Sequence, residues 1–247
     1  RIATWKVNGI RAREAQFTEW LDSESPDVIC LQEIKAPPEK VPESICDLEG
    51  FDCYWHGEGG YSGVGLHIRR SLAPSIAFFH PGFDHETRIV CARIGNTTIV
   101  SVYVPNGGKD FAAKMDFLNQ LEEFSASEID AGRDLIVCGD MNVTRSDDDV
   151  HPKERKPKAI GQLPVERELF NGMIERRFED LGRKFEPDND RLYTWWAPWR
   201  NLRQRNIGWR LDYILATPGL AAKASSCVVR PEVGTSDHAP VVAEIEI

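Results

Sequence analysis

Residues 134–142 read DLIVCGDMN, and this stretch decides how the rest of the chain is interpreted. Its four apolar residues, 135–138, are typical of a β-strand that is buried on both faces. The run ends at Gly139, and Asp140 and Asn142 follow with one residue between them. Alternate residues of an extended backbone point to the same side, so Asp140 and Asn142 can be directed at one point beyond the strand. A simple turn is the competing interpretation, because Gly, Asp and Asn are also turn residues.

The composition is that of a globular protein with a sizeable core: of 247 residues, 41% are hydrophobic and 28% are charged. We expect one domain over residues 1–247, since sandwiches and barrels of this length often form a single domain. No apolar run approaches the length of a membrane span, and the first ten residues do not resemble a signal peptide. The six cysteines form no CxxC pair, which favours a reduced, cytoplasmic setting.

The formal net charge of −9 argues against a protein that coats nucleic acid, because such proteins are basic overall. This net charge is still compatible with an enzyme that has a local basic face. A site rich in carboxylates that holds a divalent cation would itself make the total more negative.

The predicted strands come in pairs, and the predicted helices are fewer. Apolar or alternating runs predict strands over residues 2–8, 27–31, 64–68, 88–94, 97–104, 211–215 and 241–247. Helical spacing of apolar residues predicts helices over residues 11–21, 111–129 and 164–178. This order favours a layered α/β protein with two sheets over a doubly wound parallel sheet.

Polar residues stand at the ends of several other apolar runs, and they are Asn8, Glu33, Tyr103, Asp212, Asp237 and His238. Carboxylate and amide oxygens are the ligands that Mg²⁺ and Mn²⁺ prefer, and no Cys/His set has zinc spacing. An Asp–His pair can orient and charge an imidazole. The collection suits metal-assisted attack of water on a phosphodiester or a phosphomonoester.

Each of these polar residues also has an ordinary structural explanation. Glu33 could be a solvated carboxylate at a strand end, and Asp212 could simply pair with Arg210. The sequence SDHAP could be a turn with His238 on the surface, and Tyr103 could belong to the core. All these explanations would have to hold together to remove the predicted site.

Ten stretches together resemble one family, and they read WKVNGIRAR, ICLQEIKA, GYSGVGL, DHETR, VYVPNGG, CGDMNV, LPVERE, YTWW, NIGWRLDYIL and SDHAPV. The sequence resembles the exonuclease III family of apurinic/apyrimidinic (AP) endonucleases, within the endonuclease/exonuclease/phosphatase superfamily. The resemblance runs from residue 5 to residue 241. It implies a four-layered α/β sandwich, in which two packed, mainly antiparallel sheets are flanked by helices.

The resemblance also implies an activity in base excision repair of DNA. The implied enzyme hydrolyses the phosphodiester 5′ to an abasic site with Mg²⁺, or with Mn²⁺ in its place, and leaves a 3′-hydroxyl. Family members often add 3′-phosphodiesterase and 3′→5′ exonuclease activity. The expected substrate is double-stranded DNA with abasic sites or blocked 3′ ends. We expect a cytoplasmic monomer, associated with the nucleoid if the source is bacterial.

Roles for the polar strand ends follow from the same resemblance. Glu33 matches the principal metal ligand, and Asn8 and Asp237 match groups near that metal. Asp140 matches the residue that activates or positions the attacking water, and Asn142 matches its orienting partner.

The remaining catalytic matches concern the scissile phosphate. His238, paired with Asp212, matches the imidazole that contacts this phosphate, and Tyr103 matches a phosphate contact near the leaving group. If a second metal binds, Asp140, Asn142 and His238 are the expected ligands.

DNA contacts are expected mainly from an aromatic and basic part of the chain. By resemblance, Trp195, Trp209 and Leu211 line a pocket for a flipped-out baseless sugar, which is cheapest to extrude where no base is stacked. Trp199 and Lys109 fall where family members insert side chains into the DNA. The candidates for phosphate contact are Arg11, Tyr61, Lys153, Arg155, Lys156 and Lys158.

Position 6 departs from the family pattern, since Lys6 stands where an asparagine is usual. An ammonium there is expected to weaken metal binding by like-charge repulsion, or to substitute in part for the cation, and in either case to reduce activity. Gln162, where an aromatic residue is usual, and Lys109, where some members carry arginine, are smaller departures.

Two other functions remain open. The superfamily includes inositol-phosphate phosphatases and sphingomyelinases, which share the metal core but need not share the stretches NGIRAR or GWRLDY. Lys6 also raises the alternative of a protein that binds abasic DNA with little or no catalysis.

Overall fold

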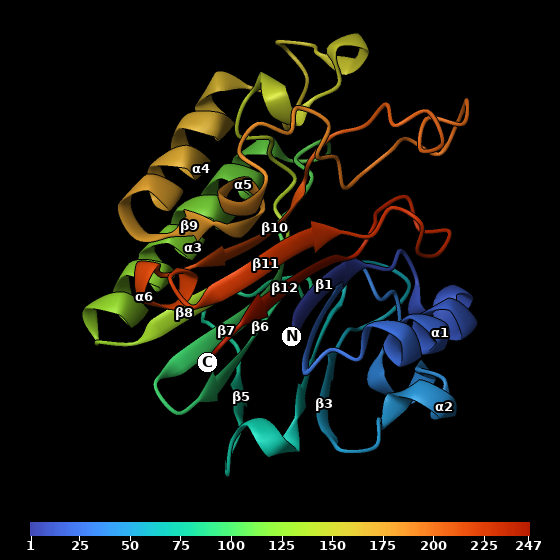
Figure 1. The fold of residues 1–247 in the computed structure, drawn as a ribbon, viewed down its shortest axis with the longest axis vertical. Helices are drawn as coiled ribbons and strands as arrows, with labels where there is room; N and C mark the ends of the chain where they lie inside the picture. The colour runs from blue at the N-terminus through green and yellow to red at the C-terminus, as the bar shows by residue number, and fades with distance from the viewer.

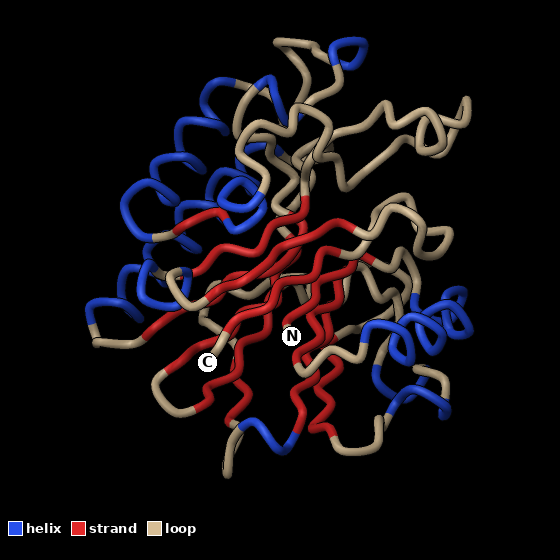
Figure 2. Tube along the Cα trace, viewed as in Figure 1, coloured by secondary structure: helices blue, strands red, loops and turns tan.

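The computed structural model describes residues 1–247 and contains two six-stranded sheets that pack face to face (Figure 1). The strand order is β11-β12-β1-β2-β4-β3 in the first sheet and β5-β6-β7-β8-β10-β9 in the second. Neighbours are antiparallel except for the pairs β1–β2 and β7–β8. Helices lie outside both sheets (Figure 2), so the predicted four-layered sandwich with mainly antiparallel sheets is confirmed.

The strands of the first sheet are β1 (Ile2–Lys6), β2 (Val28–Gln32), β3 (Phe51–His56), β4 (Val64–Arg69), β11 (Ala224–Val229) and β12 (Val241–Ile245). Those of the second sheet are β5 (Ala77–Phe79), β6 (Ile89–Ile94), β7 (Thr97–Tyr103), β8 (Asp134–Asp140), β9 (Glu179–Asp180) and β10 (Asp212–Ala216). The α-helices are α1 (Glu14–Glu24), α2 (Glu43–Cys46), α3 (Phe111–Asp130), α4 (Pro164–Arg177), α5 (Leu181–Phe185) and α6 (Pro218–Ala221). The 3-10 turns are η1 (Ile10–Arg13), η2 (Pro38–Lys40), η3 (Arg70–Leu72), η4 (Asp147–Asp149) and η5 (Pro152–Glu154).

The apolar run in β8 is buried on both faces because it lies between the other sheet and two helices. Ile136 and Cys138 belong to the core cluster between the sheets. Leu135 and Val137 belong to a second cluster with residues of α3 and α4, such as Phe117. The alternation of side chains along the strand thus fills two cores at once, as the sequence predicts.

The first sheet is covered on its outer face by α1 and α2. Phe17 and Trp20 of α1 pack in one cluster with Trp5 of β1. The rings of Trp5 and Trp20 meet edge to face at 5.4 Å, an arrangement that favours aromatic pairs. Helix α1 therefore fixes the strand whose far end carries Lys6 and Asn8.

Some element boundaries differ from the sequence prediction. The predicted strand 2–8 ends at Lys6, and the predicted helix 11–21 begins as the 3-10 turn η1 before α1 starts. The sequence analysis missed β3, β5, β9 and β11, together with α2, α5 and α6. The missed strands all lie at sheet edges, where mixed polar and apolar residues hide the pattern of a buried strand. No helix is long and apolar enough to cross a membrane.

A fully buried histidine in β4 makes the fold sensitive to acid. The ring of His67 lies 4.3 Å from that of Trp55, tilted by 54°, and neither ring nitrogen has a hydrogen-bond partner. Burial lowers the pKa of His67 from 6.5 to about 3. The unfolded chain therefore takes up this proton first, and the free energy of unfolding falls as the pH drops from about 6.5 toward 3.

We expect His67 alone to cost about 2 kcal/mol of stability at pH 5, from about 1.4 kcal/mol for each pH unit below its unfolded pKa. His67→Leu should remove this loss, because leucine fills the site without a titrating group. Urea unfolding of both proteins at pH 7 and pH 5 checks the expectation. Equal pH dependence in the two proteins would show that another group is responsible.

Candidate active site

The chain turns sharply at the ends of β1, β2 and β8. Asn8, Glu33 and Asn142 have φ angles of 51°, 54° and 51°, in the left-handed region that few residues other than glycine adopt. Such backbone strain is concentrated at functional sites. The three residues follow the ends of β1, β2 and β8. Figure 2 shows long loops gathered beyond one end of the strands.

Gly139 lets β8 lie close to β7 just before the site. Its φ is 150°, and a Cβ there would lie 1.8 Å from the carbonyl oxygen of Val102. Only glycine fits this approach. The register then places Asp140 opposite Tyr103 of β7 and Asp212 of β10.

Asp140 and Asn142 meet as predicted, but the turn after β8 brings them together rather than strand alternation, because Asn142 has a φ of 51°. The Asn142 backbone N–H donates to Asp140 Oδ1 at 2.9 Å, and its side-chain Nδ2 donates to Asp140 Oδ2 at 3.2 Å. The same Nδ2 donates to the Val104 carbonyl at 2.8 Å. Asp140 is fully buried, so a carboxylate is held at the strand end with a fixed orientation.

His238 and Asp212 form a buried pair beside Asp140. His238 Nδ1 lies 2.7 Å from Asp212 Oδ2, which also accepts a hydrogen bond from Thr194 Oγ1 at 2.6 Å. Burial raises the pKa of Asp212, although the imidazole opposes this shift. Burial also opposes a charge on His238, but the Asp212 carboxylate outweighs it and raises the pKa of His238.

Two of the ordinary explanations for these residues are therefore wrong. His238 is 1% exposed, so it is not a surface histidine in a turn. Arg210 does not pair with Asp212, because its guanidinium is held by Asp149 and Asp180.

The second group of polar side chains contains Asn8, Glu33 and Asp237. Asn8 Nδ2 donates to Asp237 Oδ1 at 3.0 Å. Lys35 Nζ reaches Asn8 Oδ1 at 2.7 Å and Glu33 Oε1 at 2.8 Å. Glu33 is thus an ion-paired group rather than a solvated carboxylate. Sequence analysis missed Lys35, although it stands two residues after Glu33.

Lys6 lies between the two groups and contacts both. Its Nζ is 3.1 Å from Glu33 Oε2, 3.1 Å from Asp140 Oδ2 and 3.2 Å from His238 Nε2. Burial opposes a charge on Lys6, but the surrounding anions outweigh it and raise the pKa well above 10.5. An ammonium therefore stands where the polar strand ends converge.

Tyr103 closes this site from the β7 side. The Lys6 ammonium lies 5.0 Å from the centre of its ring, and Arg88 lies 4.8 Å from it. Burial raises the pKa of Tyr103 to about 12, so the phenol keeps its proton. Tyr103 is 8% exposed, which means that it is both a core residue and part of the site wall.

Arg88 is a further residue that sequence analysis did not assign, although its stretch DHETR was noted. Its Nη2 donates to the Tyr61 hydroxyl at 2.8 Å, and its Nη1 donates to the Tyr103 carbonyl at 3.4 Å. Arg88 is buried, whereas Tyr61 is 60% exposed. The guanidinium thereby connects an exposed aromatic ring to the site wall.

The tryptophans fall into three environments. Trp195 Nε1 donates to Asp237 Oδ2 at 3.1 Å, and its ring meets that of Trp209 edge to face at 5.4 Å. Trp196 is core, whereas Trp199 is 59% exposed. Leu211 is buried next to the site strand β10. The other expected DNA contacts are exposed, namely Arg11, Lys109, Lys153, Arg155, Lys156 and Lys158.

The donor chemistry of the site fits a hard divalent cation. Asn8, Glu33 and Asp237 offer amide and carboxylate oxygens, and ligand atoms of Asp140, Asp212 and His238 lie within 4.8 Å of one another. A buried carboxylate, amide and imidazole cluster at the strand ends of such a sandwich fits the class of metal-dependent phosphoesterases.

Comparison with known proteins specifies this class further. The sequence profile described as "Endonuclease/Exonuclease/phosphatase family" matches residues 3–238, and the chain belongs to this family. The Bacillus subtilis protein "Exodeoxyribonuclease" is 33% identical over 260 residues, which cover 100% of each chain.

Two solved structures share the fold over the full chain. A 3′ phosphatase, NExo from Neisseria, bound to a product DNA hairpin, has a TM-score of 0.89 and 30% identity and covers 100% of this chain and 99% of that one. An AP endonuclease from Archaeoglobus fulgidus has a TM-score of 0.87 and 30% identity, with the same coverage.

Proposed function

We propose that this protein is a DNA-repair nuclease that hydrolyses the phosphodiester 5′ to abasic sites in double-stranded DNA. The relatives named as an exodeoxyribonuclease and an AP endonuclease support this proposal. The observation that carries it is the hydrogen bond from Trp195 to Asp237. It joins the aromatic and basic loop, suited to holding a base-free sugar, directly to the phosphoesterase centre.

The two buried pairs, Asp140 with Asn142 and His238 with Asp212, have different roles in the proposed reaction. Asp140 takes a proton from the attacking water, and Asn142 keeps the carboxylate and the water in line. His238 directs its Nε2 toward a phosphoryl oxygen, and Asp212 holds the imidazole in that orientation through Nδ1. The protonated phenol of Tyr103 contacts the phosphate near the leaving group.

Glu33, with Asn8 and Asp237 beside it, would hold a Mg²⁺ or Mn²⁺ ion. When bound, this ion supplies positive charge against the phosphoryl oxygens, as a Lewis acid does. Glu33 must then share its Oε2 with Lys6, which contacts it now. We expect Lys6 to reduce activity relative to a chain with asparagine at this position.

The loops supply the proposed DNA surface. Trp195, Trp209 and Leu211 are proposed to bound the pocket for the baseless sugar, which is cheap to extrude because it has no base to unstack. Trp199 and Lys109 enter the duplex beside the lesion. The exposed side chains proposed for phosphate contact are Arg11, Tyr61, Lys153, Arg155, Lys156 and Lys158.

The same site is proposed to act at blocked 3′ ends, as a 3′-phosphodiesterase and 3′→5′ exonuclease. We propose that residues 1–247 form one catalytic domain that acts as a monomer. One core cluster contains residues of both sheets, such as Cys30 and Cys138, which supports treating them as one unit.

Incision of a labelled duplex that carries one abasic-site analogue tests the proposed function. We expect cutting with Mg²⁺, none or much less with EDTA, and none of an undamaged duplex. Binding without cutting would favour the alternative of an abasic-DNA-binding protein. If the protein neither bound nor cut the duplex, the repair function would be excluded. Inositol-phosphate and lipid substrates would then be tested.

A further inference from the structure

We propose that the Lys6 ammonium is a built-in cation of the active site, which contacts the substrate phosphate and lowers the affinity of the site for divalent metal ions. The contact with phosphate rests on the proposed function, whereas the effect on metal affinity does not. Lys6 is therefore assigned two effects: it helps to bind the substrate phosphate, and it weakens the binding of divalent metal ions.

The geometry singles out Lys6 among the lysines near the site. Its Nζ contacts Glu33 on the side of the expected metal ligands and Asp140 and His238 on the side of the water-activating group. Lys35 contacts Glu33 and Asn8 only. A cation that touches both groups stands where a phosphate bound between them would place its oxygens.

The ammonium is fixed in place by the fold. Lys6 is the last residue of β1 and pairs in register with Gln32 of β2. Its carbonyl accepts a hydrogen bond from Ser236 Oγ at 2.6 Å. The side chain is 10% exposed, and the ring of Tyr103 lies beside it. Pre-organised charge of this kind needs no rearrangement when the phosphate binds.

Charge explains why metal ions should bind weakly. Both oxygens of Glu33 already face an ammonium, since Oε2 lies 3.1 Å from Lys6 and Oε1 lies 2.8 Å from Lys35. A divalent ion at Glu33 would come within a few ångströms of Lys6. Repulsion at that distance in a partly buried site weakens binding by about tenfold or more.

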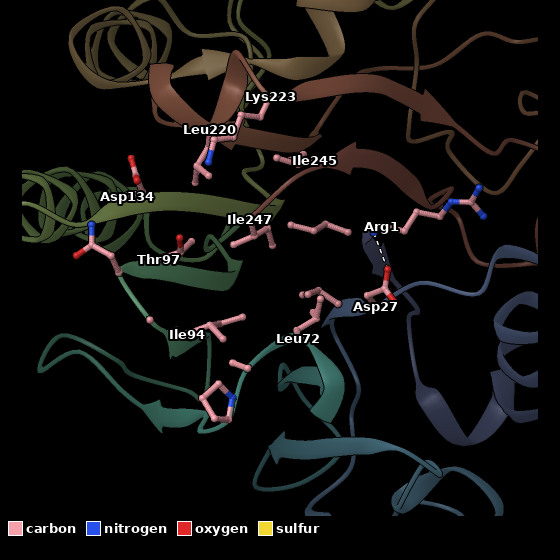
Figure 3. Close-up of a pocket in the computed structure, with 16 residues that line it drawn as sticks. Arg1, Asp27, Leu72, Ile94, Thr97, Asp134, Leu220, Lys223, Ile245 and Ile247 are labelled. Carbon is pink, nitrogen blue, oxygen red and sulfur yellow. Dashed lines mark hydrogen bonds and ion pairs between the residues drawn. The ribbon is translucent and has the colours of Figure 1, made fainter.

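Titration of the protein with Mn²⁺, followed by the loss of the free-ion electron paramagnetic resonance signal and without DNA, tests this effect. Lys6→Asn should raise the affinity about tenfold or more, and Lys6→Met should raise it as well, because it removes charge without adding an oxygen. Lys223→Met is the matched control. Lys223 lines a pocket with Arg1 and Ile247 (Figure 3), at the end of the sandwich where β1 begins, and its loss should leave the affinity unchanged.

The phosphate contact is tested by fluorescence anisotropy with an abasic duplex in EDTA. Lys6→Met should weaken this metal-free binding about tenfold, whereas Lys223→Met should not change it. Circular dichroism verifies that each variant is folded. Because wild-type protein is titrated too, a wild type that binds Mn²⁺ as tightly as Lys6→Asn overturns the proposal even if Lys6→Met does not fold.

The outcomes separate this inference from the proposed function. Suppose that a folded Lys6→Asn variant has unchanged Mn²⁺ affinity and that the wild type cuts abasic DNA. The proposed effect of Lys6 on metal affinity would then be refuted, and the repair function would not. Higher Mn²⁺ affinity in Lys6→Asn, with no cutting or binding of abasic DNA by any variant, would support the effect on metal affinity and refute the repair function.

Discussion

Replacing Asp140 with Asn should lower kcat for incision of an abasic duplex by about a thousandfold, while the affinity for that duplex changes little. An amide has the size of the carboxylate but cannot accept a proton from water, and general-base catalysis contributes about 10²- to 10⁴-fold. Asp140 is fully buried and receives two hydrogen bonds from Asn142, so its orientation is fixed.

Single-turnover incision in Mg²⁺, with binding measured in parallel, checks this expectation. The matched control is Asp134→Asn, which removes the same charge from the other end of the same strand, where Asp134 accepts a hydrogen bond from Thr217. We expect near wild-type incision from the control. If Asp140→Asn cut the duplex almost as fast as wild type, Asp140 would not be the base.

Replacing Arg210 with Met should reduce the free energy of unfolding by about 3 kcal/mol or more. Arg210 is 2% exposed and lies between two carboxylates, with Nε 2.8 Å from Asp149 Oδ1 and Nη2 2.8 Å from Asp180 Oδ2. Removing one partner of a buried ion pair costs about 3–5 kcal/mol, because the remaining charge is left in a poor solvent. Arg183 and Arg145 stay beside these carboxylates, which places the expectation at the lower end.

Urea unfolding of the two proteins at neutral pH measures this loss. Lys184→Met serves as the control, because Lys184 pairs with Glu179 and both side chains are partly exposed, at 31% and 40%. Exposed pairs contribute about 1 kcal/mol or less. The comparison bears on the site, since Arg210 directly precedes Leu211 and Asp212. If both variants lost the same free energy of unfolding, the buried ion pairs of Arg210 with Asp149 and Asp180 would not be what stabilises the segment around Asp212.

Periodicity in the sequence predicts the parts of the fold and site that lie within one strand. The apolar run before Gly139 predicts a strand buried on both faces, and the spacing of Asp140 and Asn142 predicts that their side chains meet. The pairing of His238 with Asp212 joins residues 26 positions apart, and only the family resemblance predicts it.

Contacts between distant segments were predicted only where the family resemblance implied them. Lys6 and His238 are 232 residues apart, and the packing of the strand ends decides that they touch. Lys35 and Arg88 were missed because their roles depend on partners from neighbouring loops, such as Asn8 and Tyr61. Edge strands were missed because half-exposed residues do not show the pattern of a buried strand.

The position of the cut in a single-lesion duplex tests the central claim most directly. With the damaged strand labelled at its 5′ end, the account predicts a product that ends immediately 5′ to the abasic analogue. A DNA polymerase should extend this product, because hydrolysis leaves a 3′-hydroxyl. A cut 3′ to the lesion, or a product that polymerase cannot extend, would contradict the proposed hydrolysis by the Asp140 and His238 site.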